Sequence, residues 1–238
     1  SNPLPRIQRV LTKASKIKTV GLCHGVMSGM WGLSSVLSTS IENLDFTSAG
    51  LNHFFWMVKV NAKKDCELKE LGPFPSQKIQ KGQDLLPLIR ERGLYWAKER
   101  ELPLIEQFLE LYGYLSYPEQ SHPGEYVPWA DAYCPYVKYD FKEFQKGGDD
   151  MKRKLDLTLE GKESNYWWVH ESGERELDII VGMEQNTGKL ERAVNMPNQG
   201  AISNLPDECI VECPAIIDKN GIHLEKVGYM PKGIAQLL

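Results

Sequence analysis

Long apolar runs, paired cysteines and an excess of positive charge are all missing from these 238 residues. No segment approaches the run of about 18 apolar residues that a membrane-spanning helix needs, so we expect no membrane partner. The formal net charge of -4 argues against nucleic acid as a partner, because neutralising phosphates requires a basic surface. A charged-then-apolar leader is also absent, so secretion is not expected.

Cysteine usage points to a reducing compartment. The five cysteines are odd in number and scattered, and no two of them form a CxxC pair. This pattern excludes a disulfide scaffold and predicts a cytoplasmic protein. GxGxxG and Walker-type loops are absent as well, so the chain by itself shows no cradle for a nucleotide. What remains is a globular chain, 42% apolar, which we predict to be an enzyme.

The two ends of the chain look interrupted. Ser1-Asn2-Pro3 is typical of a strand that passes into a turn, and no start methionine precedes it. Residues 230–238 are typical of the first turns of a helix. We therefore expect the chain to be an internal piece of a longer polypeptide.

The spacing of apolar residues predicts an α+β fold in a single domain that spans residues 1–238. Helices are expected over 4–16, 26–37, 84–100 and 104–111, and strands over 18–22, 46–51, 53–60 and 210–217. Asp218-Lys219-Asn220-Gly221 predicts a hairpin after the last strand. We further expect a loop over 63–82, a helix over 141–160 broken at Gly147-Gly148, and a buried helix over 174–184.

The strongest candidates for chemistry are Cys23 and His53. Cys23-His24 directly follows the predicted strand 18–22, where a short loop can present side chains at a crevice. His53 lies at the junction of two predicted strands, beside aromatic residues. A lone cysteine is usually a small buried apolar residue, and a lone histidine beside aromatics usually belongs to the core or its rim. Together, a thiolate and an imidazole would instead provide two ligands for a divalent ion, too few for a closed zinc site but suited to an open catalytic one.

Three further groups rank lower. Tyr126 lies in a turn, where an amphipathic tyrosine normally forms part of a rim. His122 and Glu119 are nearby, and we expect both to be simply exposed to solvent. Asn198 lies in a turn-rich loop, where asparagine and glycine often only satisfy backbone geometry.

Six separated motifs form one pattern. They are SNP (1–3), VGLCHGV (20–26), AGLNHFFW (49–56), DLLPLIRER (84–92), HPGEYVPW (122–129) and NMPNQGAISNLPDECIVECPAIIDKNGIH (195–223). In order and spacing they resemble glycoside hydrolase family 4, whose members hydrolyse glycosides with NAD and a divalent metal, usually manganese. The resemblance runs from Asn2 to Gly233. It implies a C-terminal catalytic domain similar to that of lactate dehydrogenase, with a Rossmann NAD domain of about 150 residues before Ser1 and further helices after Leu238.

The resemblance also implies roles for single residues. Cys23 and His53 match the two metal ligands of the family. His24 matches the position after the metal cysteine, which varies with substrate and can lie beside the leaving group. Asn2 matches a residue that contacts sugar hydroxyls, and Asn52 would line the same pocket.

In the implied mechanism, NAD takes a hydride from sugar C3, and the resulting ketone acidifies the proton at C2. The metal polarises the carbonyl, and Tyr126 removes the C2 proton, with Tyr117 as the less favoured choice. A free phenol has a pKa near ~10, so the metal and the cationic nicotinamide must favour its ionised form. Elimination of the aglycone, addition of water and return of the hydride complete the cycle. Asn198 would line the pocket near the nicotinamide.

The residues after the metal cysteine limit the range of substrates that the resemblance implies. Members that act on 6-phosphoglycosides carry Asp-Met-Pro or Asn-Val-Pro there, whereas this chain has His24-Gly25-Val26. The resemblance therefore implies a carbohydrate substrate among the unphosphorylated α-glycosides, and Gly25 is similar to members that act on α-galacturonides or α-glucuronides. It also implies a homo-oligomer, a dimer or a tetramer.

Two alternatives remain open. The first is an oxidoreductase of the lactate or malate dehydrogenase type, which uses a histidine and an arginine around a carboxylate and needs no metal. Cys23 and His53 argue against it, and manganese dependence of turnover would decide. The second is a non-catalytic fragment, inactive as given, because the chain lacks a nucleotide cradle.

Overall fold

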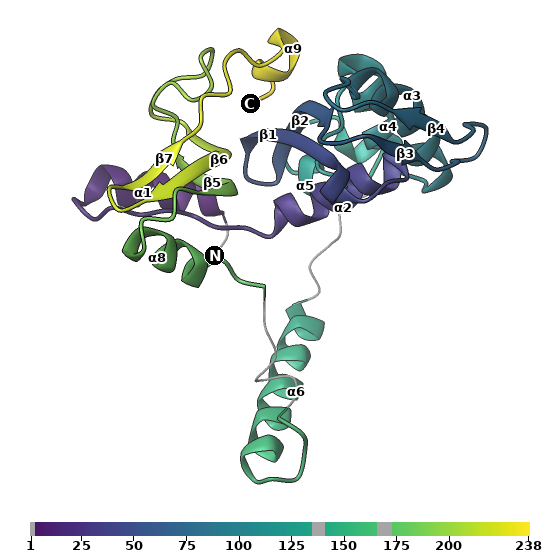
Figure 1. Ribbon diagram of the computed structural model, residues 1–238. Helices are drawn as coiled ribbons and strands as arrows, with labels where there is room; N and C mark the ends of the chain where they lie inside the picture. The colour runs from purple at the N-terminus through teal and green to yellow at the C-terminus, as the bar shows by residue number, and fades with distance from the viewer. Residues whose placement is uncertain (1–2, 135–140, 166–172) are drawn as a thin grey trace. The chain divides into compact units, whose positions relative to one another are not determined.

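The computed structural model describes residues 3–134, 141–165 and 173–238 (Figure 1). The chain forms two compact units. The larger one consists of Ser1–Pro135 and Glu176–Leu238 and contains the main sheet. The smaller one, Tyr136–Arg175, contains helix α6 (Phe141–Leu159).

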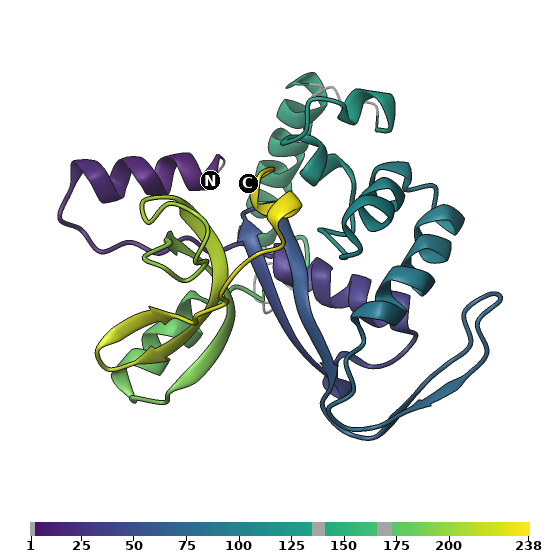
Figure 2. The same ribbon diagram turned by 90° about the horizontal axis from the view of Figure 1, so that it is seen from above.

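An antiparallel sheet organises the larger unit. Its strands are β1 (Leu44–Leu51), β2 (Phe54–Ala62), β5 (Lys189–Pro197), β6 (Ile210–Asp218) and β7 (Gly221–Leu224). They follow the order β2-β1-β6-β5, and β7 pairs with β6. β1 and β2 form one long hairpin, and β6 and β7 form another (Figure 2). A bridge between Gly50 of β1 and Glu212 of β6 joins the two halves of the sheet.

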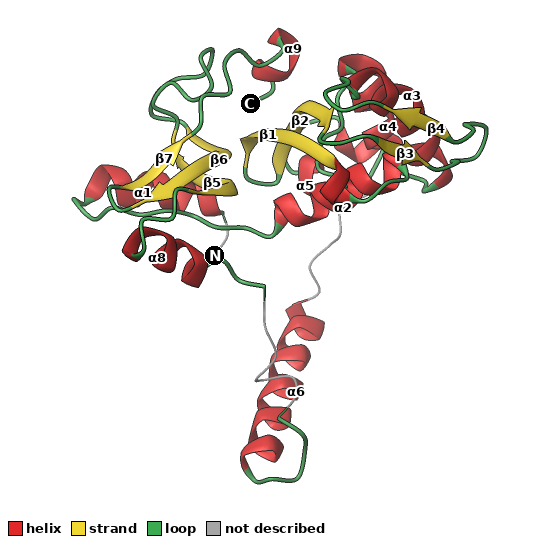
Figure 3. Ribbon diagram, in the orientation of Figure 1, coloured by secondary structure: helices red, strands yellow, loops and turns green. Residues whose placement is uncertain are grey.

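Helices pack around this sheet. The larger unit has α1 (Leu4–Ala14), α2 (Gly25–Leu37), α3 (Leu86–Glu99), α4 (Pro103–Tyr112) and α8 (Glu176–Glu184), with short turns α5 (Ser121–Gly124), α9 (Lys232–Ala235), η1 (Ile41–Asn43) and η2 (Ala130–Ala132). α2 contacts α3, and α3 contacts α4 and β2, whereas α1 contacts β5 and β6. This mixture of helices with an antiparallel sheet confirms the predicted α+β class (Figure 3). In the described ranges, no helix combines the length and apolar character needed to cross a bilayer.

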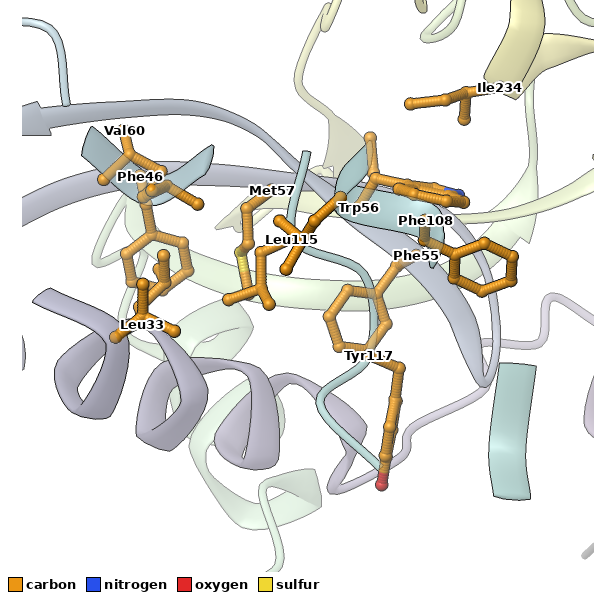
Figure 4. Close-up of a cluster of buried hydrophobic side chains, with 14 of the residues drawn as sticks. Leu33, Phe46, Phe55, Trp56, Met57, Val60, Phe108, Leu115, Tyr117 and Ile234 are labelled. Atoms are coloured by element: carbon orange, nitrogen blue, oxygen red, sulfur yellow. The ribbon is translucent and has the colours of Figure 1, made fainter. Parts of the chain in front are cut away.

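The main core lies between α2 and the β1–β2 hairpin. Residues 54–57 of β2 have no exposed surface, so both faces of this strand are covered. Figure 4 shows Met57 and Leu115 lying near Leu33 of α2. The small residues of α2 permit this close approach, because a Cβ on Gly29 would lie 2.5 Å from Met57 Cε. The same cluster extends toward the end of the hairpin where the candidate site lies.

Several local expectations are wrong. Helix α6 continues through Gly147-Gly148, since the helix-forming residues around them offset a cost of about 1 kcal/mol per glycine. Helix α8 is buried on one face only, at Ile179 and Gly182, whereas Leu177 and Ile180 are 68% and 57% exposed. The segment 63–82 contains a hairpin, β3 (Cys66–Leu68) with β4 (Gln77–Ile79), rather than loop alone. In place of a strand over 18–22, the structure has one bridge from Gly21 to Asn195.

Candidate active site

Cys23 and His53 are 30 positions apart in sequence, yet their side chains are in hydrogen-bond contact at the end of the β1–β2 hairpin. Cys23 lies just before α2, and His53 lies in the two-residue turn between β1 and β2 rather than in a strand. His53 has a φ of 68°, which is strained for a residue that carries a Cβ. Strain of this kind is typical of functional sites. The structure thus brings together the two residues predicted to bind metal.

The thiol of Cys23 is placed to ionise. Burial by itself would raise its pKa, but hydrogen bonds from the His53 and Asn52 side chains and from the Gly25 backbone favour the thiolate. The Gly25 N–H donates to Cys23 Sγ over 3.4 Å. The net result is a pKa of Cys23 below its ordinary value. Glycine suits position 25, since a Cβ there would lie 3.0 Å from the Tyr117 ring.

His53 is a hydrogen-bond partner of this thiol. The hydrogen bond with Cys23 raises the pKa of the imidazole, against the opposing effect of burial. The negative charges of Cys23 and Glu125 raise the pKa of His53 further. Glu125 Oε2 lies 3.6 Å from His53 Nδ1. Because metal ligands must be deprotonated, protonation of the imidazole would compete with binding of a divalent ion to the pair.

The donor set fits an open metal site. A thiolate and an imidazole are both ligands for divalent transition metals. Within the described ranges, no three His, Cys, Asp or Glu side chains are grouped so that they could hold an ion. Cys23 and His53 would therefore leave coordination positions for water or substrate, as catalytic metal chemistry requires.

Tyr126 lies beside the pair. Its hydroxyl donates a hydrogen bond of 2.7 Å to the backbone carbonyl of Asn52, and its ring stacks on Phe54 with 5.2 Å between centroids. Burial, followed by the negative charges of Glu125 and Glu212, raises the pKa of Tyr126 to about 12. The phenol is therefore protonated at neutral pH in this state, and a nearby cation would be needed to ionise it.

Tyr117 faces the same site and contacts His122. The Tyr117 ring stacks on His122 at 4.5 Å, and His122 makes an edge contact with His53 at 4.5 Å. Figure 4 shows the Tyr117 hydroxyl at the end of the ring remote from the apolar cluster. Burial raises the pKa of Tyr117, opposed by a hydrogen bond with Ser28. The expectation that His122 is simply exposed is wrong. Its position in a segment rich in tyrosine and proline is the sequence feature that could have indicated a role at the site.

Two further polar residues near the pair, Glu212 and Asn195, were not predicted from the sequence. Glu212 on β6 is 2% exposed, and its Oε2 accepts hydrogen bonds of 2.9 Å from Asn52 Nδ2 and from Asn195 Nδ2. The sequence feature that could have indicated Glu212 is its position as one acidic residue in the otherwise uncharged segment 210–217. Asn52 was expected to line a sugar pocket, but its side chain is buried and bound to Glu212. This hydrogen bond connects the turn before His53 with β6.

The remaining predicted site residues are Asn198, His24 and Asn2. Asn198 is fully buried. Its Oδ1 accepts a hydrogen bond of 2.7 Å from the Ile202 N–H, and its Nδ2 donates hydrogen bonds of 2.9 Å to the carbonyls of Ile202 and Leu205. These bonds hold its own loop together, so its amide is not presented to a nicotinamide as expected. His24 is exposed at the start of α2. Asn2 lies outside the described residues.

Comparisons with known proteins agree on one family. The model described as the family 4 glycosyl hydrolase C-terminal domain matches residues 48–238. An α-glucosidase of Erwinia rhapontici is 30% identical over a match that covers 100% of this chain and 55% of that protein. An α-galacturonidase of Bacillus subtilis (strain 168) is 27% identical, with coverage of 100% and 54%. The structure of a 6-phospho-α-glucosidase from gut microorganisms in complex with NAD and Mn2+ superimposes with a TM-score of 0.70 at 20% identity, covering 100% of this chain and 54% of that one.

These matches differ in what they establish. At 20% identity, the solved structure shows a shared fold alone. The chain spans about half the length of the curated relatives it matches. The family model covers most of the chain and includes His53 and Glu212, whereas Cys23 precedes the matched residues. The chain therefore belongs to glycosyl hydrolase family 4 and contains the C-terminal domain of that family.

Proposed function

We propose that the protein containing this chain hydrolyses unphosphorylated α-glycosides with the help of NAD and a divalent metal, Mn2+. The observation that carries the proposal is the hydrogen-bonded pair of Cys23 and His53 with Tyr126 beside it. The α-glucosidase and α-galacturonidase relatives support the glycosidase class. The complex of a structural neighbour with NAD and Mn2+ supports the choice of cofactors.

Two residues of this chain would hold the metal. Cys23 would bind it through the thiolate and His53 through the imidazole, as the lowered pKa of Cys23 favours. When bound, NAD supplies reversible oxidation at sugar C3, and the metal supplies a Lewis acid for the neighbouring sugar oxygens. Since the chain spans about half the length of its curated relatives and contains no GxGxxG loop, we propose that another part of the protein, a Rossmann domain, binds NAD.

Proton transfer is the task of the tyrosine. Tyr126, once ionised, would take the proton from sugar C2 as a general base. The phenolate oxygen takes up the proton, and the hydrogen bond from the resulting hydroxyl to the Asn52 carbonyl stabilises the protonated tyrosine. Tyr117 is the alternative base, because it faces the same pair of side chains. His24, exposed at the start of α2, would lie beside the leaving group.

The proposal extends to a narrower substrate, to assembly and to location. His24-Gly25-Val26 after the metal cysteine and the α-galacturonidase relative favour α-galacturonides or α-glucuronides. The exposed apolar side chains Leu177 and Ile180 on α8 favour self-association into a homo-oligomer. All five cysteines lie in the described ranges and none is in a disulfide, which agrees with a cytoplasmic location.

The decisive experiment measures turnover in the protein that contains both this chain and its NAD domain. Release of nitrophenol from aryl α-glycosides is followed with NAD and Mn2+ added separately and together, and activity is expected only with both. Uronide, neutral and 6-phospho substrates are compared side by side. Turnover in D2O is expected to place deuterium at C2 of the sugar product, because that proton is removed and replaced. Hydrolysis without NAD or metal, or without exchange at C2, would overturn the proposal.

A further inference from the structure

Glu212 occupies a central position in the sheet. Across the ladder it pairs with Gly50 of β1 on one side and with Asn195 of β5 on the other. Residues paired directly across neighbouring strands project to the same face, so the Glu212 and Asn195 side chains meet there. The carboxyl group is 2% exposed, and a buried carboxylate is costly unless donors surround it.

The first donor that binds Glu212 belongs to the turn that carries His53, one of the two proposed metal ligands. Asn52 Nδ2 donates to Glu212 Oε2 over 2.9 Å and immediately precedes His53. The Asn52 side chain is also hydrogen-bonded to Cys23. A single amide thus connects the buried carboxylate with the thiol.

The second donor fixes the approach of the chain to Cys23. Asn195 Nδ2 donates to the same oxygen of Glu212 over 2.9 Å. The backbone of Asn195 exchanges two hydrogen bonds with Gly21, of 3.0 and 2.8 Å. Gly21 lies two residues before Cys23, so Glu212 is connected to both sides of the thiol–imidazole pair.

We propose that Glu212 is a positioning residue that holds Cys23 and His53 at the spacing needed to bind one divalent metal ion. The inference rests on the proposed function for the identity of the metal ligands. Groups that orient metal ligands by hydrogen bonding contribute about 10–100-fold to metal affinity. One carboxylate oxygen that receives two amides is suited to this task, because a shift of the turn that carries Asn52, or of β5 with Asn195, would break a buried hydrogen bond.

The test measures metal affinity in the full chain, without sugar or NAD. Co2+ is the probe, since its bond to a cysteine thiolate gives a charge-transfer absorption band that reports directly on Cys23. Glu212→Ala removes the acceptor, Glu212→Gln keeps an accepting oxygen, and Glu212→Asp keeps the charge but withdraws it by one methylene. Glu191→Ala is the matched control, because Glu191 is also a buried glutamate of the same sheet, on β5.

We expect Glu212→Ala to weaken Co2+ binding about 10–100-fold, Glu212→Asp to weaken it nearly as much, and Glu212→Gln to weaken it least. Glu191→Ala should bind Co2+ as the unmutated chain does, even where its melting temperature falls. Equal affinity in Glu212→Ala and the unmutated chain, or equal losses in Glu212→Ala and Glu191→Ala, would overturn the inference. If Glu212→Ala does not fold, the Co2+ affinities of Glu212→Asp and Glu212→Gln decide between the outcomes. A Co2+ affinity of Glu212→Asp equal to that of the unmutated chain would reject the positioning role.

The same titration separates this inference from the function on which it rests. If the unmutated chain shows no thiolate band, or a band that persists in Cys23→Ser, then Cys23 does not bind the metal. That result would overturn both the metal site and the inference. A Cys23-dependent band of equal strength in all Glu212 variants would remove the inference and leave the metal site intact.

Discussion

The hydroxyl of Tyr126 donates a hydrogen bond of 2.7 Å to the backbone carbonyl of Asn52, the residue immediately before His53. This bond connects the tyrosine-rich segment with the turn that carries a proposed metal ligand. It also fixes where the phenolic proton points when the tyrosine is protonated. Removing the phenol oxygen therefore removes both a candidate base and one contact between the two segments.

Tyr126→Phe is expected to lower kcat by about 10²–10⁴-fold while KM and metal affinity change little. The ring and its stacking on Phe54 remain, so substrate binding should be preserved. Loss of the hydrogen bond to Asn52 should cost about 1 kcal/mol of stability. Steady-state kinetics on substrate deuterated at C2 should show an isotope effect at least as large as that of the unmutated enzyme.

Tyr117→Phe is the comparison that makes this result specific. A near-normal kcat in Tyr126→Phe together with a large loss in Tyr117→Phe would transfer the role of base to Tyr117. If neither substitution matters, both rings only shape the site.

Cys23→Ser and His53→Ala should each abolish turnover and weaken Mn2+ binding, measured from the electron paramagnetic resonance signal of free Mn2+. Oxidation should inactivate the enzyme reversibly, because Cys23 must be a thiolate to bind metal. Cys66→Ser and His223→Ala are matched controls, since Cys66 lies on β3 and His223 pairs with Asp218 on the β6–β7 hairpin. Wild-type activity of Cys23→Ser across a manganese titration would contradict the assignment.

Alkylation of the metal-free chain should reveal the acidity of Cys23. Its pKa is lowered, against the effect of burial, by hydrogen bonds from His53, Asn52 and Gly25, whereas burial raises the pKa of Cys66 and Cys209. The thiolate reacts, so the rate at Cys23 should rise and level off at a lower pH than the rates at the other two cysteines.

Peptide mass spectrometry after iodoacetamide treatment across a pH series gives the three profiles separately. In His53→Ala the Cys23 profile should move to higher pH, because the main hydrogen bond that favours the thiolate is lost. Identical profiles for Cys23 and Cys66 would show that the thiol is not activated. Added Mn2+ should protect Cys23 alone.

Two glycine-to-alanine substitutions should have opposite effects on stability. In Gly29→Ala the new Cβ would lie 2.5 Å from Met57 Cε and 2.9 Å from Phe55 Cε2, and this overpacking should cost about 1–3 kcal/mol. In Gly148→Ala the new Cβ meets no atom within 4 Å in the described structure, so α6 should gain up to about 1 kcal/mol from the higher helix propensity of alanine. Urea unfolding for the first and amide hydrogen exchange in α6 for the second provide the measurements.

By contrast, an unchanged midpoint for Gly29→Ala would mean that α2 can move away from β2. Faster exchange in Gly148→Ala would mean that α6 requires glycine at this position.

The local sequence pattern was sufficient to predict most helices and strands. The spacing of apolar residues predicted α2, α3 and the β1–β2 strands, and Asp218–Gly221 predicted the hairpin between β6 and β7. It failed where burial depends on distant partners. The apolar residues of α8 were read as core because a single sequence shows composition, but whether a neighbouring element covers Leu177 or Ile180 is a tertiary fact.

The sequence by itself determined the α+β class and, through separated motifs, singled out Cys23 and His53 as a pair. Only the tertiary structure decided that Asn52 and Asn198 use their amides internally and that His122 contacts His53. It also placed Glu212 in the support of the site. The physical reason is range: the bond between Asn52 and Glu212 joins residues 160 positions apart, whereas helical and strand periodicities extend over a few residues. Such a contact exists only after the two halves of the sheet have joined at Gly50 and Glu212.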